Sequence, residues 1–171
     1  MTLKDLGYSN RLEDYRIKQN LKSLEIGRII LEHKERYIVK TAKNEFVAEI
    51  TGNLRFTASV RADLPVIGDW VAFMVYDDKL AIIHEIIPRK NLLERQSIGK
   101  FGEKQPVAAN LDFALIMQSA DNDFSLNRLE RYLTICYAAK VKPVIVLSKT
   151  DLIGETETVN LLKDRYSILY T

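Results

Sequence analysis

The stretch Pro143-Val144-Ile145-Val146-Leu147-Ser148-Lys149-Thr150-Asp151 joins a strand-sized run of apolar residues to a short polar motif. A continuous apolar run rich in β-branched residues is typical of a strand that is buried on both faces, as in a parallel sheet. The polar residues that follow it match the pattern Asn/Thr/Ser-Lys-x-Asp. The stretch therefore predicts a buried strand that ends in a polar loop.

The polar loop has the chemistry of a guanine-recognition site. The carboxylate of Asp151 can accept two parallel hydrogen bonds from N1 and N2 of guanine, whereas adenine offers no such pair of donors. The stem of Lys149 can lie along the base and ribose, and the hydroxyl of Ser148, which stands where Asn is commonest, would brace the loop. We predict that Ser148, Lys149, Thr150 and Asp151 bind the guanine of GTP; the alternative is an ordinary surface turn.

The residues around this loop have the periodicity of an α/β domain. Residues 111–118 and 141–147 predict two strands, and residues 125–139 between them predict an amphipathic helix. Its expected apolar face consists of Leu126, Leu129, Leu133, Cys136 and Tyr137. A strand, a helix and a second strand of this length form one right-handed unit of a parallel sheet. Residues 155–166 predict a further helix and residues 168–170 a third strand.

A GTPase also needs a phosphate-binding loop, Gly-x-x-x-x-Gly-Lys-Ser/Thr, and this pattern does not occur in residues 1–171. The single Gly-Lys pair, Gly99-Lys100, is followed by Phe101 instead of a hydroxyl residue. In ordinary GTPases the phosphate loop precedes the guanine motif. Two explanations stay open: the guanine motif is accidental, or the domain is circularly permuted and its phosphate loop lies beyond Thr171.

The N-terminal part of the chain has the short alternating patterns of β-strands. The predicted strands are residues 26–32, 37–41, 46–50, 70–76 and 80–87. Five short strands favour a small closed barrel, because closure removes exposed sheet edges. We predict an OB-fold over residues 24–88, and an SH3-like barrel stays open as the alternative. Residues 1–23 form an extension that includes a short helix, either on the surface or docked on the barrel.

Residues 89–110 are rich in basic residues and poor in apolar ones, which predicts an exposed linker. Residues 1–110 contain 18 Lys or Arg and 15 Asp or Glu, a net charge of +3, whereas residues 111–171 contain 7 and 8, a net charge of −1. Arg89, Lys90 and Arg95 are therefore candidates for contacts with RNA phosphates. A solvated loop without a ligand is the open alternative.

The composition describes a globular chain. Of its 171 residues 47% are hydrophobic and 28% are charged, which is enough apolar material for a core. No stretch is long and apolar enough for a membrane span, and no signal peptide is recognisable, so we expect a cytoplasmic protein. The one cysteine, Cys136, cannot form an intramolecular disulfide, and its place in a helical pattern predicts a buried apolar role.

Five separated motifs, in this order, resemble the ribosome small-subunit-dependent GTPase A family. The motifs are Val66-Ile67-Gly68-Asp69-Trp70-Val71, Ile87-Pro88-Arg89-Lys90-Asn91 with Arg95, Ala108-Ala109-Asn110-Leu111-Asp112, Asn127-Arg128-Leu129-Glu130-Arg131-Tyr132-Leu133 and Val146-Leu147-Ser148-Lys149-Thr150-Asp151-Leu152. The resemblance covers about residues 24–153. It implies an N-terminal five-stranded OB-fold barrel followed, over residues 111–171, by the first part of a circularly permuted P-loop GTPase domain.

The resemblance also implies a function. Family members act late in the assembly of the small ribosomal subunit, which stimulates their hydrolysis of GTP, and they carry a C-terminal zinc-binding domain. GTP with Mg²⁺ as cofactor, and the small ribosomal subunit with its rRNA as partner, are therefore expected. We expect a monomeric fragment that is inactive alone and binds no cofactor tightly. A stand-alone OB-fold module that binds RNA or ribosomes, without nucleotide chemistry, is the alternative; an SH3-like adaptor is a third.

Overall fold

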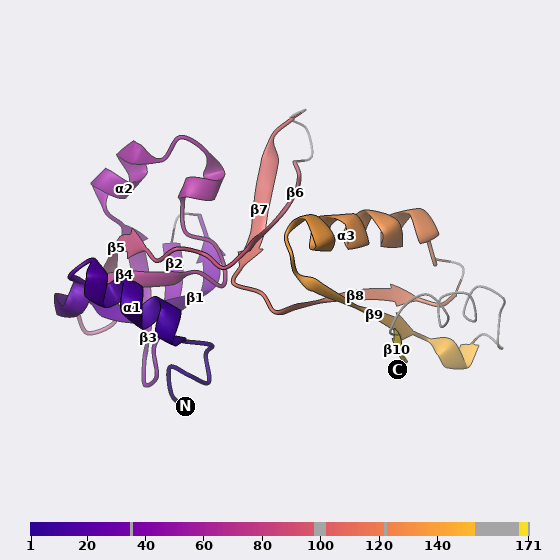
Figure 1. Cartoon of the computed structure of the whole chain (residues 1–171), viewed down its shortest axis with the longest axis horizontal. Coiled ribbons are helices and arrows are strands. Elements are labelled where there is room, and N and C mark those ends of the chain that lie inside the picture. Colours follow the sequence, from indigo (N-terminus) through magenta and orange to yellow (C-terminus); the bar gives the residue numbers. More distant parts are fainter. Residues whose placement is uncertain (35, 98–101, 122, 153–167, 171) are drawn as a thin grey trace. The chain divides into compact units, whose positions relative to one another are not determined.

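The structure is a computed structural model that describes residues 1–34, 36–97, 102–121, 123–152 and 168–170 (Figure 1). The chain divides into two compact units, residues 1–110 and residues 111–171, each of which is described by itself. No helix within the described ranges is both long and apolar enough to cross a membrane.

Five strands of the first unit close into a barrel. They are β1 (Glu25–His33), β2 (Arg36–Lys40), β3 (Glu45–Ile50), β4 (Trp70–Asp77) and β5 (Leu80–Ile86), and each agrees with its predicted range to within one residue at either end. The order around the barrel is β1-β2-β3-β5-β4, and β4 pairs with β1 to close it. Only the β3–β5 pair is parallel. This Greek-key connectivity confirms the OB-fold and replaces the SH3-like alternative.

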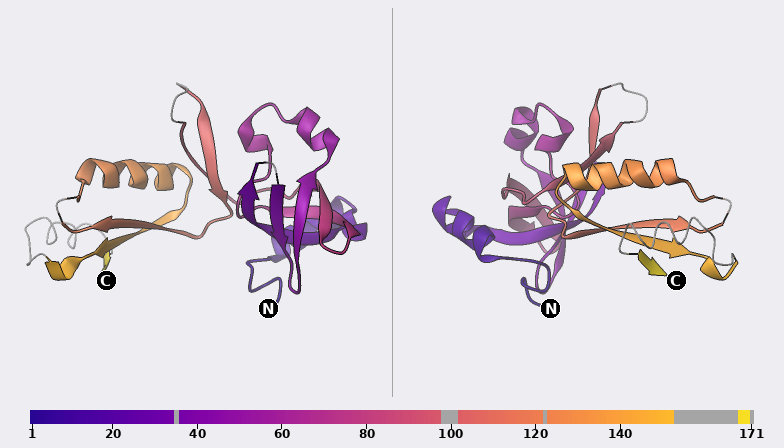
Figure 2. Two further views of the ribbon diagram at one scale, coloured as in Figure 1. Left: turned by 180° about the vertical axis from the view of Figure 1, so that it is seen from behind. Right: turned by 45° about the vertical axis from the view of Figure 1, so that its right-hand side comes forward.

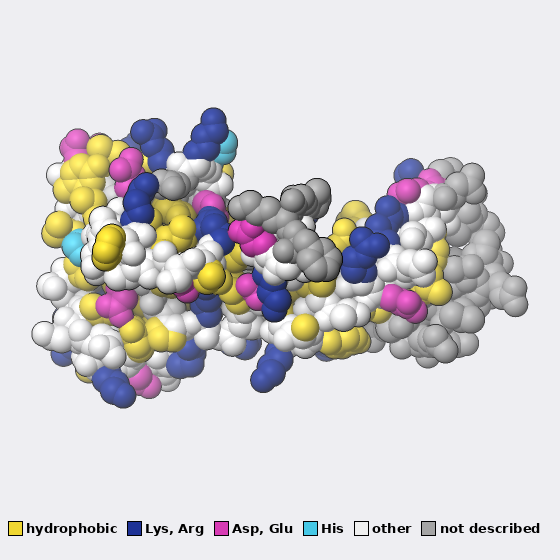
Figure 3. Space-filling view, turned by 90° about the horizontal axis from the view of Figure 1, so that it is seen from above, with side chains coloured by type: hydrophobic (Ala, Val, Ile, Leu, Met, Phe, Trp, Pro, Cys, Tyr) yellow, Lys and Arg dark blue, Asp and Glu magenta, His cyan; other side chains and the backbone are white. Residues whose placement is uncertain are grey.

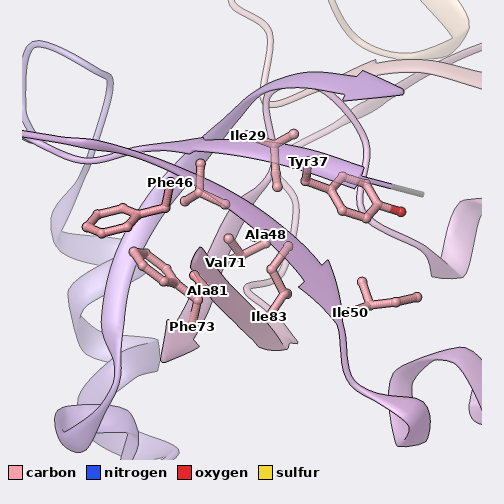
Figure 4. Packing of buried hydrophobic residues seen from close by; sticks show 10 residues of the cluster. Ile29, Tyr37, Phe46, Ala48, Ile50, Val71, Phe73, Ala81 and Ile83 are labelled. Atoms are coloured by element: carbon pink, nitrogen blue, oxygen red, sulfur yellow. The ribbon is translucent and has the colours of Figure 1, made fainter. Parts of the chain in front are cut away.

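The barrel interior is filled by alternate residues of its strands. In β3 every second side chain is buried and the others face outward, which is the pattern that a one-sided strand requires. The rings of Phe46 and Phe73 lie 5.5 Å apart between β3 and β4. Figure 4 shows the buried cluster, whose members are Ile29, Tyr37, Val39, Phe46, Ala48, Ile50, Val71, Phe73, Ala81 and Ile83.

Short helices close the barrel. Between β3 and β4, helix α2 (Gly52–Thr57) lies over one open end of the barrel, and its Leu54 packs against the core cluster (Figure 2). Thr51 caps α2, because its side chain accepts a hydrogen bond from the N–H of Leu54 at 3.3 Å. The 3₁₀ helices η1 (Leu21–Ser23) and η2 (Arg61–Asp63) shape the two connections next to the barrel.

The N-terminal extension docks on the barrel through helix α1 (Asn10–Lys18). Leu12 of α1 is buried in a second apolar cluster together with Ile26, Trp70, Ala72 and Ile87. The ring of Tyr8 meets Trp70 edge-on, with 5.0 Å between the ring centroids. Of the two predictions for this segment, the docked helix is therefore the correct one.

The segment predicted to be an exposed linker is largely folded. Strands β6 (Leu92–Gln96) and β7 (Lys104–Ala109) form an antiparallel hairpin, which belongs to the first unit. The N–H of Ala109 donates to the carbonyl of Ile67 at 2.8 Å and fixes the end of β7 to the barrel turn. Gly68 in this turn adopts a φ of +91° and lies so close to Ala109 that a side chain would collide with its carbonyl oxygen.

The second unit is the predicted α/β unit. Strands β8 (Phe113–Ser119), β9 (Lys142–Ser148) and β10 (Ile168–Tyr170) form a parallel sheet in the order β10-β9-β8, with η3 (Thr150–Leu152) after β9. Helix α3 (Leu126–Ala138) connects β8 to β9 and lies along one face of the sheet (Figure 1). The βαβ unit and the third strand are confirmed. The helix predicted at residues 155–166 lies outside the described residues.

Helix α3 packs through a narrower apolar face than predicted. Leu129, Leu133 and Cys136 are buried, whereas the two outer members of the predicted face, Leu126 and Tyr137, are exposed. Burial raises the pKa of the Cys136 thiol, as expected for a cysteine that packs as a small apolar residue.

Candidate guanine-binding site

The predicted guanine motif lies at the carboxyl end of β9, where the chain leaves the sheet. Ser148 is the last residue of the strand, and Lys149 adopts a left-handed φ of +59° that turns the backbone into η3. Asp151, within η3, is exposed. In open parallel sheets, ligands bind outside the carboxyl ends of the strands. The structure thus places the motif at the edge of the sheet where a nucleotide site is expected.

The neighbouring strand holds the start of the motif. Ser119 at the end of β8 lies opposite Ser148 in the parallel register. The N–H of Ala120 donates to the carbonyl of Ser148 at 2.9 Å, and the Ser148 hydroxyl donates to the carbonyl of Gln118 at 3.4 Å. The hydroxyl therefore braces the end of β9 against β8. This gives Ser148 the bracing role expected of it, although its contact is with the next strand.

Lys149 is bound to an acidic residue that sequence reasoning missed. Its Nζ lies 2.9 Å from Oδ2 of Asp121, and the other oxygen of Asp121 accepts hydrogen bonds from the Ser119 hydroxyl at 2.8 Å and from the N–H of Asp123 at 3.1 Å. The contact with Lys149 is the main cause that lowers the pKa of Asp121 to about 2, and it raises the pKa of Lys149. A polar residue just past the end of the neighbouring strand was the signal in the sequence.

The loop between β8 and α3 is fixed by a buried amide. Oε1 of Gln118 accepts hydrogen bonds from the N–H of Ser125 at 3.1 Å and from Nε of Arg128 at 3.3 Å. Arg128 also contacts the side chain of Asp123, with 3.2 Å between its terminal nitrogen and Oδ2. Arg128 therefore pins the loop that carries Asp121, whereas a solvated position on the helix surface was the default expectation.

The three predicted RNA-binding residues lie in the first unit and differ in their surroundings. Arg89 is engaged inside the protein: its guanidinium makes two hydrogen bonds with the carboxylate of Asp69, at 2.7 and 2.8 Å, and also donates to the carbonyls of Ala62 and Leu64. Asp69 is completely buried. Lys90 and Arg95 are exposed, and Arg95 donates to the side chain of Gln105 at 3.1 Å.

The engagement of Arg89 corrects its assignment as a free phosphate contact. With its donors used on Asp69 and on two carbonyls, the guanidinium serves to join the η2 segment, the start of β4 and the beginning of the former linker. A contact with RNA phosphate would compete with a buried ion pair. The surface that RNA could reach is therefore represented by Lys90 and Arg95.

Metal binding has no counterpart in the part of the chain that the structure describes. There, no three His, Cys, Asp or Glu side chains gather as a metal site would require. The residues that would hold Mg²⁺ or zinc in the expected family are thus not assigned to any described residue. What the described residues do offer is a base-recognition loop.

Comparisons with known proteins agree with this geometry. The family model described as RsgA GTPase matches residues 86–171. The curated protein "Small ribosomal subunit biogenesis GTPase RsgA" of Opitutus terrae is 36% identical over 135 residues, which are 74% of this chain and 37% of that protein. Its counterpart "RsgA 1" of Bacteroides thetaiotaomicron is 36% identical over 146 residues, 85% of this chain and 41% of that protein. The chain thus spans about two-fifths of the length of these relatives.

Two solved structures share the fold. YloQ, described as a circularly permuted GTPase, aligns with a TM-score of 0.61 and 24% identity over 86% of this chain and 51% of its own. YjeQ from Thermotoga maritima aligns with a TM-score of 0.60 and 19% identity over 85% of this chain and 51% of its own. An OB-fold barrel followed by the opening of a circularly permuted GTPase domain is therefore the architecture of this chain.

Proposed function

The chain belongs to the RsgA GTPase family, and from this premise we propose that the protein that carries it binds and hydrolyses GTP in the biogenesis of the small ribosomal subunit. The observation that carries the proposal is the position of Ser148–Asp151 at the carboxyl end of β9, within the residues that match the family. The proposed partner is the small ribosomal subunit, which would stimulate hydrolysis late in its own assembly.

In this proposal the described residues recognise the base of the nucleotide. The exposed carboxylate of Asp151 would accept hydrogen bonds from N1 and N2 of guanine, and the stem of Lys149 would lie against the ring. Mg²⁺ bound to the phosphates of GTP would neutralise the charge that develops during phosphoryl transfer. The phosphate loop is expected after residue 171, in accordance with the circular permutation of the fold.

The test of guanine recognition is Asp151→Asn in the longer protein that includes the phosphate loop. This change replaces one acceptor of the carboxylate by a donor, which mismatches guanine and suits xanthine, whose position 2 carries an oxygen. We expect GTP turnover to fall by orders of magnitude while turnover of xanthosine triphosphate is retained or gained, because unpaired polar groups are rejected strongly. Steady-state kinetics with both nucleotides measure this shift in preference.

Ser148→Ala is the matched control within the same loop. It removes only a bracing hydrogen bond of 3.4 Å to the neighbouring strand, so about 1 kcal/mol or less of binding free energy should be lost, without a change in base preference. If Asp151→Asn leaves the preference for guanine unchanged, the loop is an ordinary turn and the guanine assignment is wrong.

We further propose that the barrel unit binds rRNA. The support is the +3 net charge of residues 1–110, the OB-fold itself and the exposed cations Lys90 and Arg95. Figure 3 shows Lys and Arg side chains dispersed over one face of this unit, between apolar ones. Dispersed cations suit contacts with phosphates that do not depend on base sequence.

The test of RNA binding is Lys90→Glu with Arg95→Glu, measured by fluorescence anisotropy with rRNA fragments over a range of salt concentrations. We expect weaker binding and a shallower dependence on salt, because fewer counterions are released. Lys18→Glu with Lys22→Glu makes the same change of charge on exposed residues of the N-terminal extension and serves as the matched control. Equal losses in both variants would mean that net charge alone matters and that the former linker is a spectator.

A further inference from the structure

The ion pair between Asp121 and Lys149 fixes the side chain that would lie against the guanine ring. Lys149 leaves the end of β9, and its Nζ reaches Asp121 beyond the end of β8. The Lys149 side chain nevertheless keeps 55% of its surface exposed. The ammonium is therefore held while much of the side chain stays accessible.

We propose that Asp121 is a positioning residue for nucleotide binding: it holds Lys149 stretched across the ends of β8 and β9, so that the methylene stem forms a ready surface for the purine ring. The proposal rests on the guanine site proposed above. It concerns the flat face of the base, whereas Asp151 is proposed to read its hydrogen-bonding edge. The two residues should therefore affect different properties of the bound nucleotide.

Asp121 is suited to this task because its carboxylate is itself fixed. One oxygen accepts hydrogen bonds from the Ser119 hydroxyl and the N–H of Asp123, which leaves the other to bind Lys149. Ser119 and Ser148 are paired in the parallel register of β8 and β9. The geometry of the ion pair is thus set by two paired strands, and the left-handed backbone of Lys149 directs its side chain from the same point.

A held lysine binds a base better than a free one for an entropic reason. A free lysine side chain samples many rotamers, and binding must immobilise it. When Asp121 already holds the ammonium, the stem can pack against the ring with less loss of freedom, which is the general benefit of preorganisation. The contact of the stem with a ring face does not distinguish guanine from hypoxanthine or xanthine.

The test uses the longer protein with its phosphate loop and measures GDP and IDP binding by calorimetry. Asp121→Asn keeps an oxygen that can accept from Ser119 and Asp123 but removes the charge that holds Lys149. We expect GDP to bind about three- to fivefold more weakly, the range of an exposed ion pair, with the GDP to IDP preference unchanged. In a Lys149→Met background, Asp121→Asn should have no further effect.

Asp123→Asn is the matched control, because it removes an equal charge two residues away whose side chain contacts Arg128 instead. It should leave GDP binding unchanged. The proposal is overturned if Asp121→Asn binds GDP as tightly as the parent, or if it weakens binding equally with Lys149 and with Met at position 149. Asp151→Asn in the same experiment separates the two hypotheses: a shift in base preference there, with no effect of Asp121→Asn, refutes the positioning role alone.

Discussion

The buried ion pair of Asp69 and Arg89 is the strongest polar contact in the barrel unit. Asp69 is 0% exposed, and its Oδ2 also accepts a hydrogen bond from the N–H of Val66 at 2.9 Å. We expect Asp69→Ala to lower the free energy of unfolding by about 3–5 kcal/mol, because it leaves the guanidinium of Arg89 without its counter-charge. Urea unfolding followed by the fluorescence of Trp70, the single tryptophan, measures this loss.

Asp78→Ala controls for the loss of a carboxylate, since Asp78 is exposed in the turn between β4 and β5. It should change the free energy of unfolding by no more than about 0.5 kcal/mol. A similarly small effect of Asp69→Ala would show that Arg89 finds other partners, and would return Arg89 to the set of candidate RNA contacts.

The carboxyl of Asp121 should titrate far below an ordinary aspartate. Its pKa is lowered to about 2, mainly by the ammonium of Lys149. An aspartate in an unfolded chain titrates near pH 3.9, so the stabilising contact is fully present above that pH and is lost as the pH falls toward 2. An NMR titration of the side-chain carboxyl measures the value directly, and Lys149→Met should raise it. A carboxyl that titrates near 4 in both proteins would mean that the pair does not persist in solution.

Sequence reasoning located the residues of the guanine loop but not their partners. Ser148–Asp151 could be found because a short motif directly follows a buried strand. Asp121 lies 28 positions before Lys149, and only the parallel register of β8 and β9 brings the two together. Arg89 was taken for a phosphate contact for the same reason: its partner Asp69 lies 20 positions earlier, in a turn that the sequence places but does not pair.

At the scale of elements, helix α1 covers the tryptophan of the barrel. Leu12 is 2% exposed and Trp70 is 1% exposed, and both belong to the same apolar cluster. Replacing Leu12 by Ala removes a buried side chain from this contact, so the free energy of unfolding should fall by about 2–5 kcal/mol. We also expect the emission of Trp70 to shift toward longer wavelengths as the helix loosens. Chemical unfolding and fluorescence spectra measure both effects.

Ile17→Ala in the same helix is the control, because Ile17 is 49% exposed. It shortens an aliphatic side chain at the surface and should change the stability by no more than about 0.5 kcal/mol. If both variants behave alike, α1 contributes little to the barrel, and the N-terminal extension is an accessory segment instead of part of the fold.

The elements that were predicted well share a clear periodicity. The five barrel strands alternate between buried and exposed residues, so their ranges followed from the sequence to within one residue. The hairpin of β6 and β7 was missed because only its barrel-proximal residues are apolar, while glycine and basic residues further out resemble a loop. Its folding depends on a distant contact, the hydrogen bond from Ala109 to Ile67, which no local pattern indicates.

At the scale of the whole molecule, the α/β unit has one face that helix α3 does not cover. Phe113, Leu115 and Met117 alternate along β8 and are exposed, opposite to the face on which α3 packs. Parallel sheets are normally covered on both faces. The exposed row agrees with the proposal that a complete GTPase domain adds further layers to this sheet, since the curated relatives are more than twice as long as the matched region.

The same proposal predicts how residues 1–171 should treat nucleotides when they are produced by themselves. The guanine loop offers contacts to the base, worth about 2–4 kcal/mol before the cost of immobilising the ligand, whereas the phosphates would meet no phosphate loop in this sequence. We therefore expect GDP to bind more weakly than micromolar and GTP not to be hydrolysed. Calorimetry with GDP and a phosphate-release assay measure both. Micromolar or tighter binding would mean that residues 1–171 already contain a phosphate site, and the permuted arrangement proposed for this chain would have to be abandoned.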